Sequence, residues 1–208
     1  MNYLPFTFLL ILFSISNVYV YSNANAEQFP VSELIDKGIK SYKQGNHTEA
    51  IIYYDKALKI DSRNVDILFY KGIALYELDM PREAITFYDK VISLNPLYMN
   101  AIINKGVALN SLDLYEEAIF FYDKALKIDP LDTLALINKG ISYNNMGKYP
   151  EAIIYFDKAL KIDPLNTLAL INKGITLQNL EKSDEAERYF TKVITLDPTN
   201  EIAIKAIK

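Results

Sequence analysis

Few residues in this chain are of the types that carry out catalysis or hold metal ions. Its 208 residues include no cysteine and one histidine, His47. Without cysteine there is no disulfide framework, thiolate nucleophile or cysteine-based metal site, and one histidine cannot form a multi-histidine site. We expect His47 to be a surface residue in a turn between helices. The sequence also contains no phosphate-binding glycine loop or zinc-protease motif, so we predict no enzyme activity, no metal and no cofactor.

Regularly spaced carboxamides are the side chains best suited to binding another polypeptide. Asn104, Asn138 and Asn172 follow one another at intervals of 34 residues, and Asn110 and Asn144 have the same spacing. A carboxamide can donate to a backbone C=O and accept from a backbone N–H. Asparagine inside a helix costs up to about 0.7 kcal/mol relative to alanine, so a row of asparagines calls for a reason. Either the row binds an extended peptide, or duplication of one segment copied it.

Four aromatic residues of the N-terminal half are a second set of candidate binding residues. They are Tyr42, Phe69, Tyr70 and Tyr76. Tyrosine offers a large contact area at low entropic cost, so these residues could anchor hydrophobic side chains of a partner. The alternative is ordinary packing between neighbouring helices.

Composition and charge narrow the class of partner. The chain has 22 Lys+Arg and 26 Asp+Glu, a net charge of -4, and half of its residues are apolar. It lacks the basic excess that binds nucleic acid, and its apolar content is ample for a folded core. The expected partner is therefore a protein or peptide and not a nucleic acid. Asp-Lys pairs at 55–56, 89–90, 123–124 and 157–158 are expected to form a solvated outer face.

One unit of 34 residues is repeated five times, and these units must position the side chains above. Lys-Gly pairs recur at 37–38, 71–72, 105–106, 139–140 and 173–174. The units are 31–64, 65–98, 99–132, 133–166 and 167–200. Such a period indicates a stacked repeat architecture, in which each unit buries its apolar surface against its neighbours.

Each unit is predicted to form two amphipathic helices, because its apolar and small residues recur at spacings of three and four. Gly45 and Gly147 are placed to end first helices, and Pro81 and Pro150 to begin second helices. The second helices should stop at Asp-Pro pairs, because the residue before proline is pushed out of the helical region. These pairs are Asp129-Pro130, Asp163-Pro164 and Asp197-Pro198.

The recurring residues resemble the tetratricopeptide repeat. The resemblance rests on glycine 38 and its equivalents, on alanine 50, aromatic 54 and small residue 57 with theirs, and on proline in four of five units. The sets are Gly38, Gly72, Gly106, Gly140 and Gly174; Ala50, Ala84, Ala118, Ala152 and Ala186; Tyr54, Tyr88, Tyr122, Phe156 and Phe190; Ala57, Val91, Ala125, Ala159 and Val193; Pro96, Pro130, Pro164 and Pro198. The resemblance covers residues 31–200, and Ser62 replaces the proline of the first unit.

This resemblance implies an all-α fold, a right-handed superhelical solenoid of antiparallel helix pairs. It also implies a protein-interaction scaffold that binds an extended segment of a partner in a concave groove lined by the first helices. The groove residues carried over from the family are Asn104, Asn138, Asn172, Asn110, Asn144, Tyr42, Phe69, Tyr70 and Tyr76.

The two ends of the chain carry separate expectations. Residues 1–26 contain no charged side chain, are largely apolar and finish in Ala24-Asn25-Ala26, as in a secretory signal peptide. A retained N-terminal membrane anchor is the alternative, so the protein is expected to be secreted or extracytoplasmic, or tethered to a membrane. Residues 201–208 would form a short partial cap. Poor cover there leads either to fraying or to self-association of array ends, which would make the protein an assembly factor and a homo-oligomer.

Overall fold

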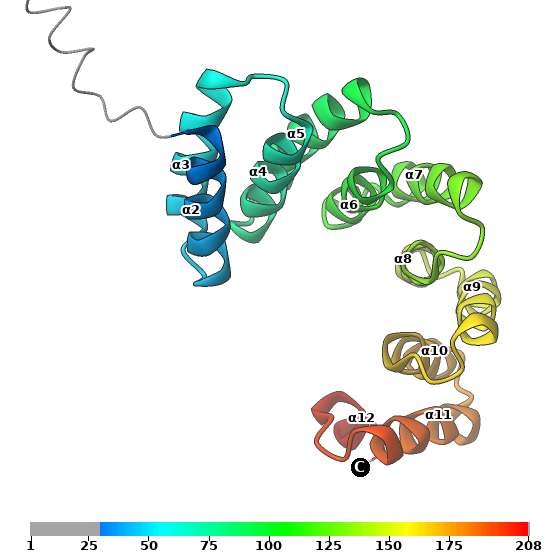
Figure 1. The fold of residues 1–208 in the computed structure, drawn as a ribbon. Coiled ribbons are helices and arrows are strands. Elements are labelled where there is room, and N and C mark those ends of the chain that lie inside the picture. Colours follow the sequence, from blue (N-terminus) through cyan, green and yellow to red (C-terminus); the bar gives the residue numbers. More distant parts are fainter. Residues whose placement is uncertain (1–29, 208) are drawn as a thin grey trace, which may run out of the picture.

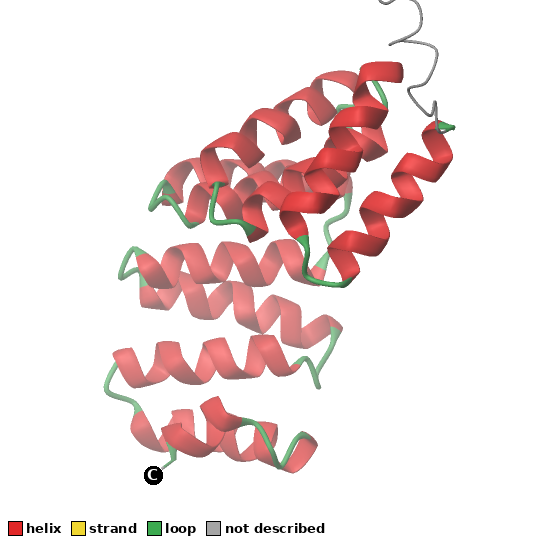
Figure 2. Cartoon of the chain, turned by 90° about the vertical axis from the view of Figure 1, so that its left-hand side faces the viewer, coloured by secondary structure: helices red, strands yellow, loops and turns green. Residues whose placement is uncertain are grey.

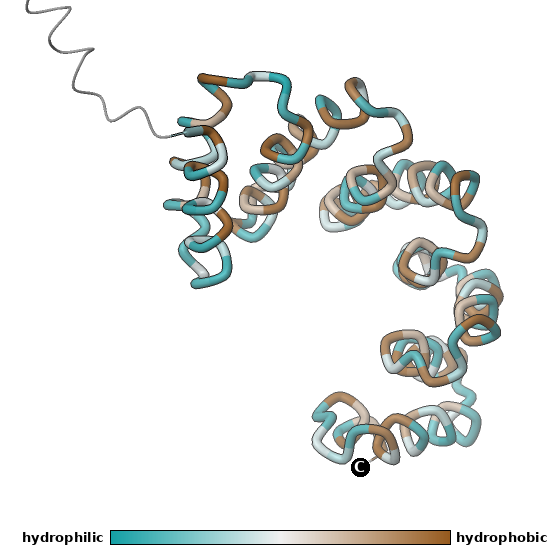
Figure 3. Tube along the Cα trace, viewed as in Figure 1, coloured by the Kyte–Doolittle hydropathy of each residue, from teal (hydrophilic) through white to brown (hydrophobic). Residues whose placement is uncertain are grey.

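Paired helices make up the computed structural model, which describes residues 30–207 (Figures 1 and 2). The first helices of the pairs are α2 (Val31–Lys43), α4 (Val65–Glu77), α6 (Met99–Asn110), α8 (Thr133–Asn145) and α10 (Thr167–Asn179). The second helices are α3 (His47–Ile60), α5 (Pro81–Leu94), α7 (Tyr115–Ile128), α9 (Tyr149–Ile162) and α11 (Ser183–Leu196), and α12 (Glu201–Ala206) follows. Hydrophobic and hydrophilic residues alternate around them (Figure 3).

The predictions for residues 1–26 lie outside the described residues. Among residues 30–207, no helix has the length and apolar character needed to cross a membrane.

The pairs stack into a curved array with the first helices on its inner side. Each first helix contacts its own second helix and also the next first helix, in the series α2, α4, α6, α8 and α10. The second helices instead contact the first helix of the following pair. Figure 1 shows the resulting arc, with α6, α8 and α10 inside and α7, α9 and α11 outside. We call the inner side, formed by the first helices, the concave face.

Within each pair the helices meet at a glycine and an aromatic ring. A Cβ placed on Gly140 would lie 2.6 Å from Cε1 of Phe156, and one on Gly174 would lie 2.7 Å from Cε1 of Phe190. The same contact joins glycine and tyrosine in the other three pairs, and all five rings are fully buried. The recurrence of glycine is thereby explained, because any side chain would occupy the space that the ring fills.

The turn within each pair needs one residue with a left-handed backbone. Gly45 and Gly147 take this conformation, with φ of 79° and 74°. In the other three pairs the equivalent residues are Asp79, Asp113 and Glu181, with φ of 59°, 60° and 60°. Glycine takes up this conformation without steric cost, whereas L-residues are strained by it. The sequence prediction that Gly45 and Gly147 end first helices is confirmed.

Side-chain caps begin most of the first helices that follow another unit. Asn64, Asp132, Asn166 and Asn200 each accept a hydrogen bond from the backbone N–H three residues later. Such a cap contributes about 1 kcal/mol. Tyr98 takes this place before α6 and makes no cap. The second helices α7, α9 and α11 end directly before the Asp-Pro pairs, as predicted.

Candidate peptide-binding face

The row of asparagines lies on three consecutive inner helices, α6, α8 and α10. Asn104, Asn138 and Asn172 are all half-buried. The Nδ2 atom of Asn104 donates to the carbonyl of Asn100 at 2.9 Å, and that of Asn172 donates to the carbonyl of Leu168 at 2.8 Å. Two of the three carboxamides therefore use part of their hydrogen-bonding capacity within their own helix. Polar side chains in helices commonly bond the carbonyl four residues earlier in this way.

Each carboxamide in this row still has hydrogen-bonding capacity. An amide group has two N–H donors and an oxygen with two lone pairs. Within residues 30–207 the Oδ1 atoms of Asn104, Asn138 and Asn172 accept no hydrogen bond, and one N–H of each bonded amide is left over. Each asparagine of the row can therefore offer a donor and an acceptor to a partner. The hydrogen bonds of Asn104 and Asn172 to their own helices restrict the orientation of these two side chains.

The second pair of asparagines has a structural role that the sequence did not reveal. The hydroxyl of Ser142 donates to Oδ1 of Asn110 at 2.8 Å, and that of Thr176 donates to Oδ1 of Asn144 at 2.9 Å. Both hydroxyls belong to fully buried residues. Asn110 and Asn144 therefore link neighbouring first helices, and their carbonyl oxygens are committed to the fold. In both pairs the asparagine lies 32 residues before the hydroxyl residue, and this repeated spacing is the feature of the sequence that could have indicated the link.

The candidate aromatic residues of the N-terminal half differ in burial. Phe69 is 7% exposed and packs between the rings of Tyr88, at 6.1 Å, and Tyr98, at 5.1 Å. It is part of the core, so the packing alternative holds for this residue. Tyr70 is 36% exposed, and its ring stacks on Tyr54 at 6.2 Å.

Tyr42 and Tyr76 lie half-buried at the ends of α2 and α4. The Tyr42 ring lies 5.0 Å from the imidazole of His47. Burial raises the pKa of the Tyr42 hydroxyl, and the nearby Glu77 carboxylate raises it further. His47 is the first residue of α3 and is half-buried, and its buried Nδ1 has no hydrogen-bond partner among residues 30–207. It is therefore less exposed than a plain surface residue.

Tyr98 and Asp66 are two further candidate site residues in the N-terminal half, and the sequence alone does not indicate them. The Tyr98 hydroxyl donates to Oδ1 of Asp66 at 3.2 Å. Burial and the Asp66 carboxylate together raise the pKa of Tyr98 to about 12. Asp66 and Tyr70 are four residues apart on α4, so their side chains lie on the same side of the helix. Tyr70 is also 34 residues before Asn104, which places it in line with the asparagine row.

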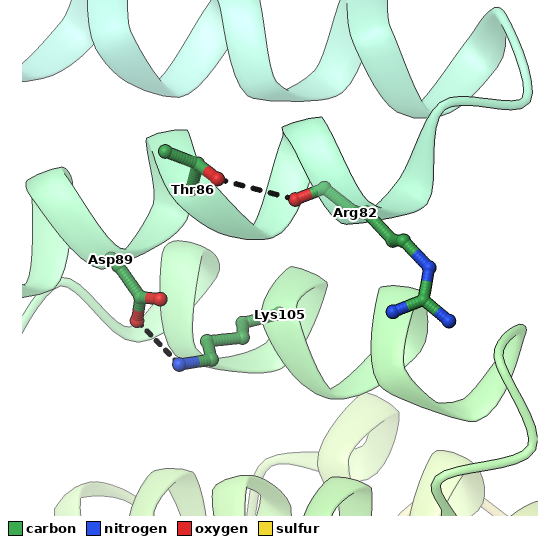
Figure 4. A network of polar contacts seen from close by, with 4 residues as sticks. All are labelled: Arg82, Thr86, Asp89 and Lys105. Atoms are coloured by element: carbon green, nitrogen blue, oxygen red, sulfur yellow. Dashed lines mark hydrogen bonds and ion pairs between the residues drawn. The ribbon is translucent and has the colours of Figure 1, made fainter.

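On the other side of the first helices, the recurring lysines connect neighbouring units. Lys105 of α6 pairs with Asp89 of α5, as Figure 4 shows, and its Nζ lies 4.2 Å from the centre of the Phe121 ring. The same arrangement recurs with Lys71, Lys139 and Lys173, whose aspartates are Asp55, Asp123 and Asp157 and whose rings are Phe87, Tyr155 and Tyr189.

The aspartates are solvent-accessible, as expected, and each of them also pairs with a lysine of the next unit. The Asp123 side chain is 47% exposed, but its lysine partner is 7% exposed. Burial by itself lowers the pKa of Lys139, and interactions with Asp123 and Tyr155 outweigh that effect and raise it. The lysine therefore remains charged and joins two units.

Residues 30–207 contain no group of three or more histidine, aspartate or glutamate side chains that could hold a metal ion. The pockets near the outer helices are open to solvent. One of 310 Å³ is lined by Pro130, Leu131, Leu136, Lys158, Lys161 and Ile162. Another of 540 Å³ is lined by Asp184, Glu187, Arg188 and Thr191.

The chain belongs to the tetratricopeptide repeat family. Models of this family, described as tetratricopeptide repeat or TPR repeat, match residues 40–79, 66–97, 100–131, 133–166 and 167–200. No curated protein sequence matched the chain. The tetratricopeptide fold is a scaffold for protein–protein interaction, and the chain has the predicted all-α fold of this family, a right-handed superhelical solenoid.

Solved structures with the same architecture include the MamA protein. It is 27% identical, with a TM-score of 0.68, over 79% of this chain and 90% of that one. The thermophilic TPR protein TTC0263 of Thermus thermophilus is 15% identical, with a TM-score of 0.73, over 86% and 97%. YrrB, a TPR protein with an unusual peptide-binding site, is 22% identical, with a TM-score of 0.65, over 91% and 97%. The last two show likeness of fold alone.

Proposed function

We propose that this protein binds an extended segment of a partner protein along its concave face. The observation that carries the proposal is the row of half-buried carboxamides on α6, α8 and α10, whose side-chain oxygens accept no hydrogen bond from residues 30–207. Asn104, Asn138 and Asn172 would hydrogen-bond the main chain of the segment. The exposed Leu134 and Leu168, one turn before Asn138 and Asn172, would contact its side chains. Main-chain recognition gives affinity with little selectivity for sequence.

Export fits the proposal but rests on residues 1–26 alone. We propose that this segment directs the protein out of the cytoplasm, either as a cleaved signal peptide or as a retained anchor. The partner would then be an exported protein or the exposed part of a membrane protein. Recovery of the mature chain from an extracytoplasmic fraction, with its N-terminus sequenced, tests this location.

Selection of peptides followed by substitution tests binding on the concave face. The full chain would be used to select dodecapeptides from a random phage-displayed library. Affinities of the enriched peptides would then be measured for a variant in which Asn104, Asn138 and Asn172 are all alanine. We expect a loss of at least about tenfold, because each lost hydrogen bond contributes about 1 kcal/mol. Unchanged affinity, or no enriched peptide, contradicts the proposal.

The fold should survive these substitutions. Alanine has the higher helix propensity, so the melting temperature of the triple variant should be equal to that of the wild type or higher. A matched control replaces Thr86, Thr191 and Thr195 with alanine, since all three are exposed on second helices. We expect the control to retain wild-type affinity.

A further inference from the structure

The lysines between neighbouring units have a recurring environment. At four successive boundaries between units, a lysine ammonium group lies against an aspartate carboxylate and over an aromatic ring. The distances from Nζ to the ring centre run from 4.2 Å at Phe121 to 4.5 Å at Tyr189. A carboxylate supplies a charged partner and a ring face attracts a cation, so together they form a site suited to an amine or a guanidinium group.

The concave face of α4 presents the same two kinds of group without a lysine or arginine. Asp66 is exposed, and its carboxylate accepts a hydrogen bond from Tyr98 through one oxygen. Tyr70 is on the same side of the helix, with 36% of its surface exposed. Its ring is supported by Tyr54 and lies 6.0 Å from the ring of Phe69. No ion pair within residues 30–207 involves Asp66, and no cation there lies over Tyr70 or Tyr98.

Charge is distributed unevenly along the inner helices. The only charged residue in each of α6, α8 and α10 is the lysine that pairs with an aspartate of the preceding second helix. In α4 the corresponding Lys71 is paired with Asp55, which leaves Asp66 and Glu77 without a compensating cation in the helix. The first helices therefore offer a negative, aromatic surface at α4 and an uncharged, carboxamide surface from α6 to α10.

We propose that the concave face of α4 is a cation subsite that binds an arginine or lysine side chain of the partner segment. The Asp66 carboxylate would pair with this cation, and the rings of Tyr70 and Tyr98 would contact it. Arginine suits the site best, because its planar group stacks on aromatic rings and bonds carboxylates. The remainder of the segment, which is uncharged, lies along α6, α8 and α10. This inference rests on the proposed function and defines the chemistry of its partner.

The peptides selected from the random dodecapeptide library by the full chain provide the first test. We expect them to be enriched in arginine or lysine toward one end. A labelled copy of an enriched peptide is then compared with a copy in which citrulline, a neutral isostere, replaces arginine. Loss of the charge should weaken binding to the wild type by about tenfold, the size typical of a charge-assisted hydrogen bond.

Substitution of Asp66 provides the second test. Asp66→Asn should weaken binding of the arginine peptide by about the same factor and leave binding of the citrulline peptide unchanged, because the two changes remove one interaction. Asp66→Lys should reverse the preference of selected peptides toward acidic residues. Asp184→Asn is the matched control, since Asp184 lies in the first turn of the outer helix α11 just as Asp66 lies in the first turn of α4.

The outcomes separate the inference from the proposed function. Enriched peptides that lack basic residues, or that bind the Asp66→Asn variant as tightly as the wild type, overturn the cation subsite. The proposed function stands in that case if the triple asparagine variant still loses affinity. If the library yields no enriched peptide at all, both are overturned.

Discussion

At the scale of single residues, the turn within each helix pair shows how backbone geometry selects amino acids. All five turns contain one residue with positive φ, but glycine occupies only two of them. Aspartate tolerates the left-handed region better than most L-residues, because its short side chain can bond locally. Glutamate has no such advantage, so Glu181 is the most strained of the five.

Replacing Glu181 by glycine should therefore stabilise the protein. Relief of left-handed strain is worth about 1–2 kcal/mol, and the greater flexibility of glycine in the unfolded chain offsets part of it. We expect the free energy of unfolding in urea to rise by about 0.5–1 kcal/mol. The reverse change, Gly147→Ala, should lower it by about 1 kcal/mol. A stability loss in the Glu181→Gly variant would show that its side chain makes an important contact.

The buried tyrosines predict a loss of stability in alkali. Burial raises the pKa of Tyr54 from 10.0 to about 12, with Tyr70 and Tyr42 adding to the shift. A group whose pKa is higher in the folded state stabilises the fold below its unfolded pKa, and this contribution is lost as the pH rises through the folded pKa. The stability of the wild type should thus fall between pH 10 and 12. Lys139 and Lys173, whose pKa values are also raised, act in the same direction.

Tyr54→Phe isolates one part of this effect. Phenylalanine occupies the equivalent place in the last two pairs, as Phe156 and Phe190. The free energy of unfolding of the variant at pH 7 should therefore lie within about 1 kcal/mol of that of the wild type. Between pH 10 and 12 its stability should decline less steeply. Urea denaturation across this range measures the difference. Parallel curves for the two proteins would mean that Tyr54 does not titrate differently on folding.

At the scale of the elements, helix pairing depends on the contact between glycine and an aromatic ring. Two effects of Gly140→Ala have opposite signs. Helix propensity alone predicts stabilisation by about 1 kcal/mol. The new Cβ would lie 2.6 Å from Phe156, a fully buried ring, and overpacking of this kind costs about 1–3 kcal/mol.

We therefore expect a net loss of stability in Gly140→Ala, measured as a lower melting temperature and urea midpoint. Asn145→Ala at the exposed end of the same helix is the control, since it gains propensity without a clash. If Gly140→Ala raised the melting temperature as much as the control does, the close packing of α8 on α9 would be wrong.

The fold of residues 31–200 could be predicted from the sequence because its determinants lie close together in the chain. The glycine and its ring are 16 residues apart within one unit, and the turn glycines and Asp-Pro pairs act on their immediate neighbours. Repetition then showed the same determinants five times, so the family could be recognised without knowing how the units stack.

The candidate site could be predicted only in part, because it depends on contacts between units. The sequence predicts Asn110 to be a groove residue, yet its side-chain oxygen accepts a hydrogen bond from Ser142 on the next first helix. The sequence also predicts Phe69 to be a groove residue, but its ring is buried and packs against that of Tyr98. Tyr98 itself lies where other units have a capping asparagine or aspartate, so its link to Asp66 depends on the stacking of α6 on α4.

At the scale of the whole molecule, the two surfaces of the array differ in what they offer a partner. The concave face is formed by half-buried carboxamides, aliphatic residues and tyrosines, whereas the second helices carry twice as many charged residues as the first helices. Binding of an extended segment to the inner surface would contact several units at once, so affinity could accumulate from weak contacts at each unit.

The residues at the α2 end of the array disfavour self-association by stacking of a further unit. Glu33 and Lys40 of α2 stand where the other first helices have Ile67, Ala135 or Thr176, or their equivalents, all of which are fully buried. A further unit stacked on α2 would have to bury these charges, and taking charged groups out of water is costly even though Glu33 is paired with Lys37. At the other end Ile202 of α12 is 54% exposed, while Ala203 packs against α10 and α11 as a continuing first helix would.

Position-specific photo-crosslinking tests the central claim most directly. The photoreactive residue p-benzoylphenylalanine would replace Asn138 on the concave face or, in a second variant, Thr191 on the outer helix α11. Each full-length variant would be irradiated with a library-selected labelled peptide. Crosslinking from position 138, suppressed by excess unlabelled peptide, is the result we predict, with none from position 191. Equal crosslinking from both positions, or crosslinking from position 191 alone, would contradict binding on the concave face.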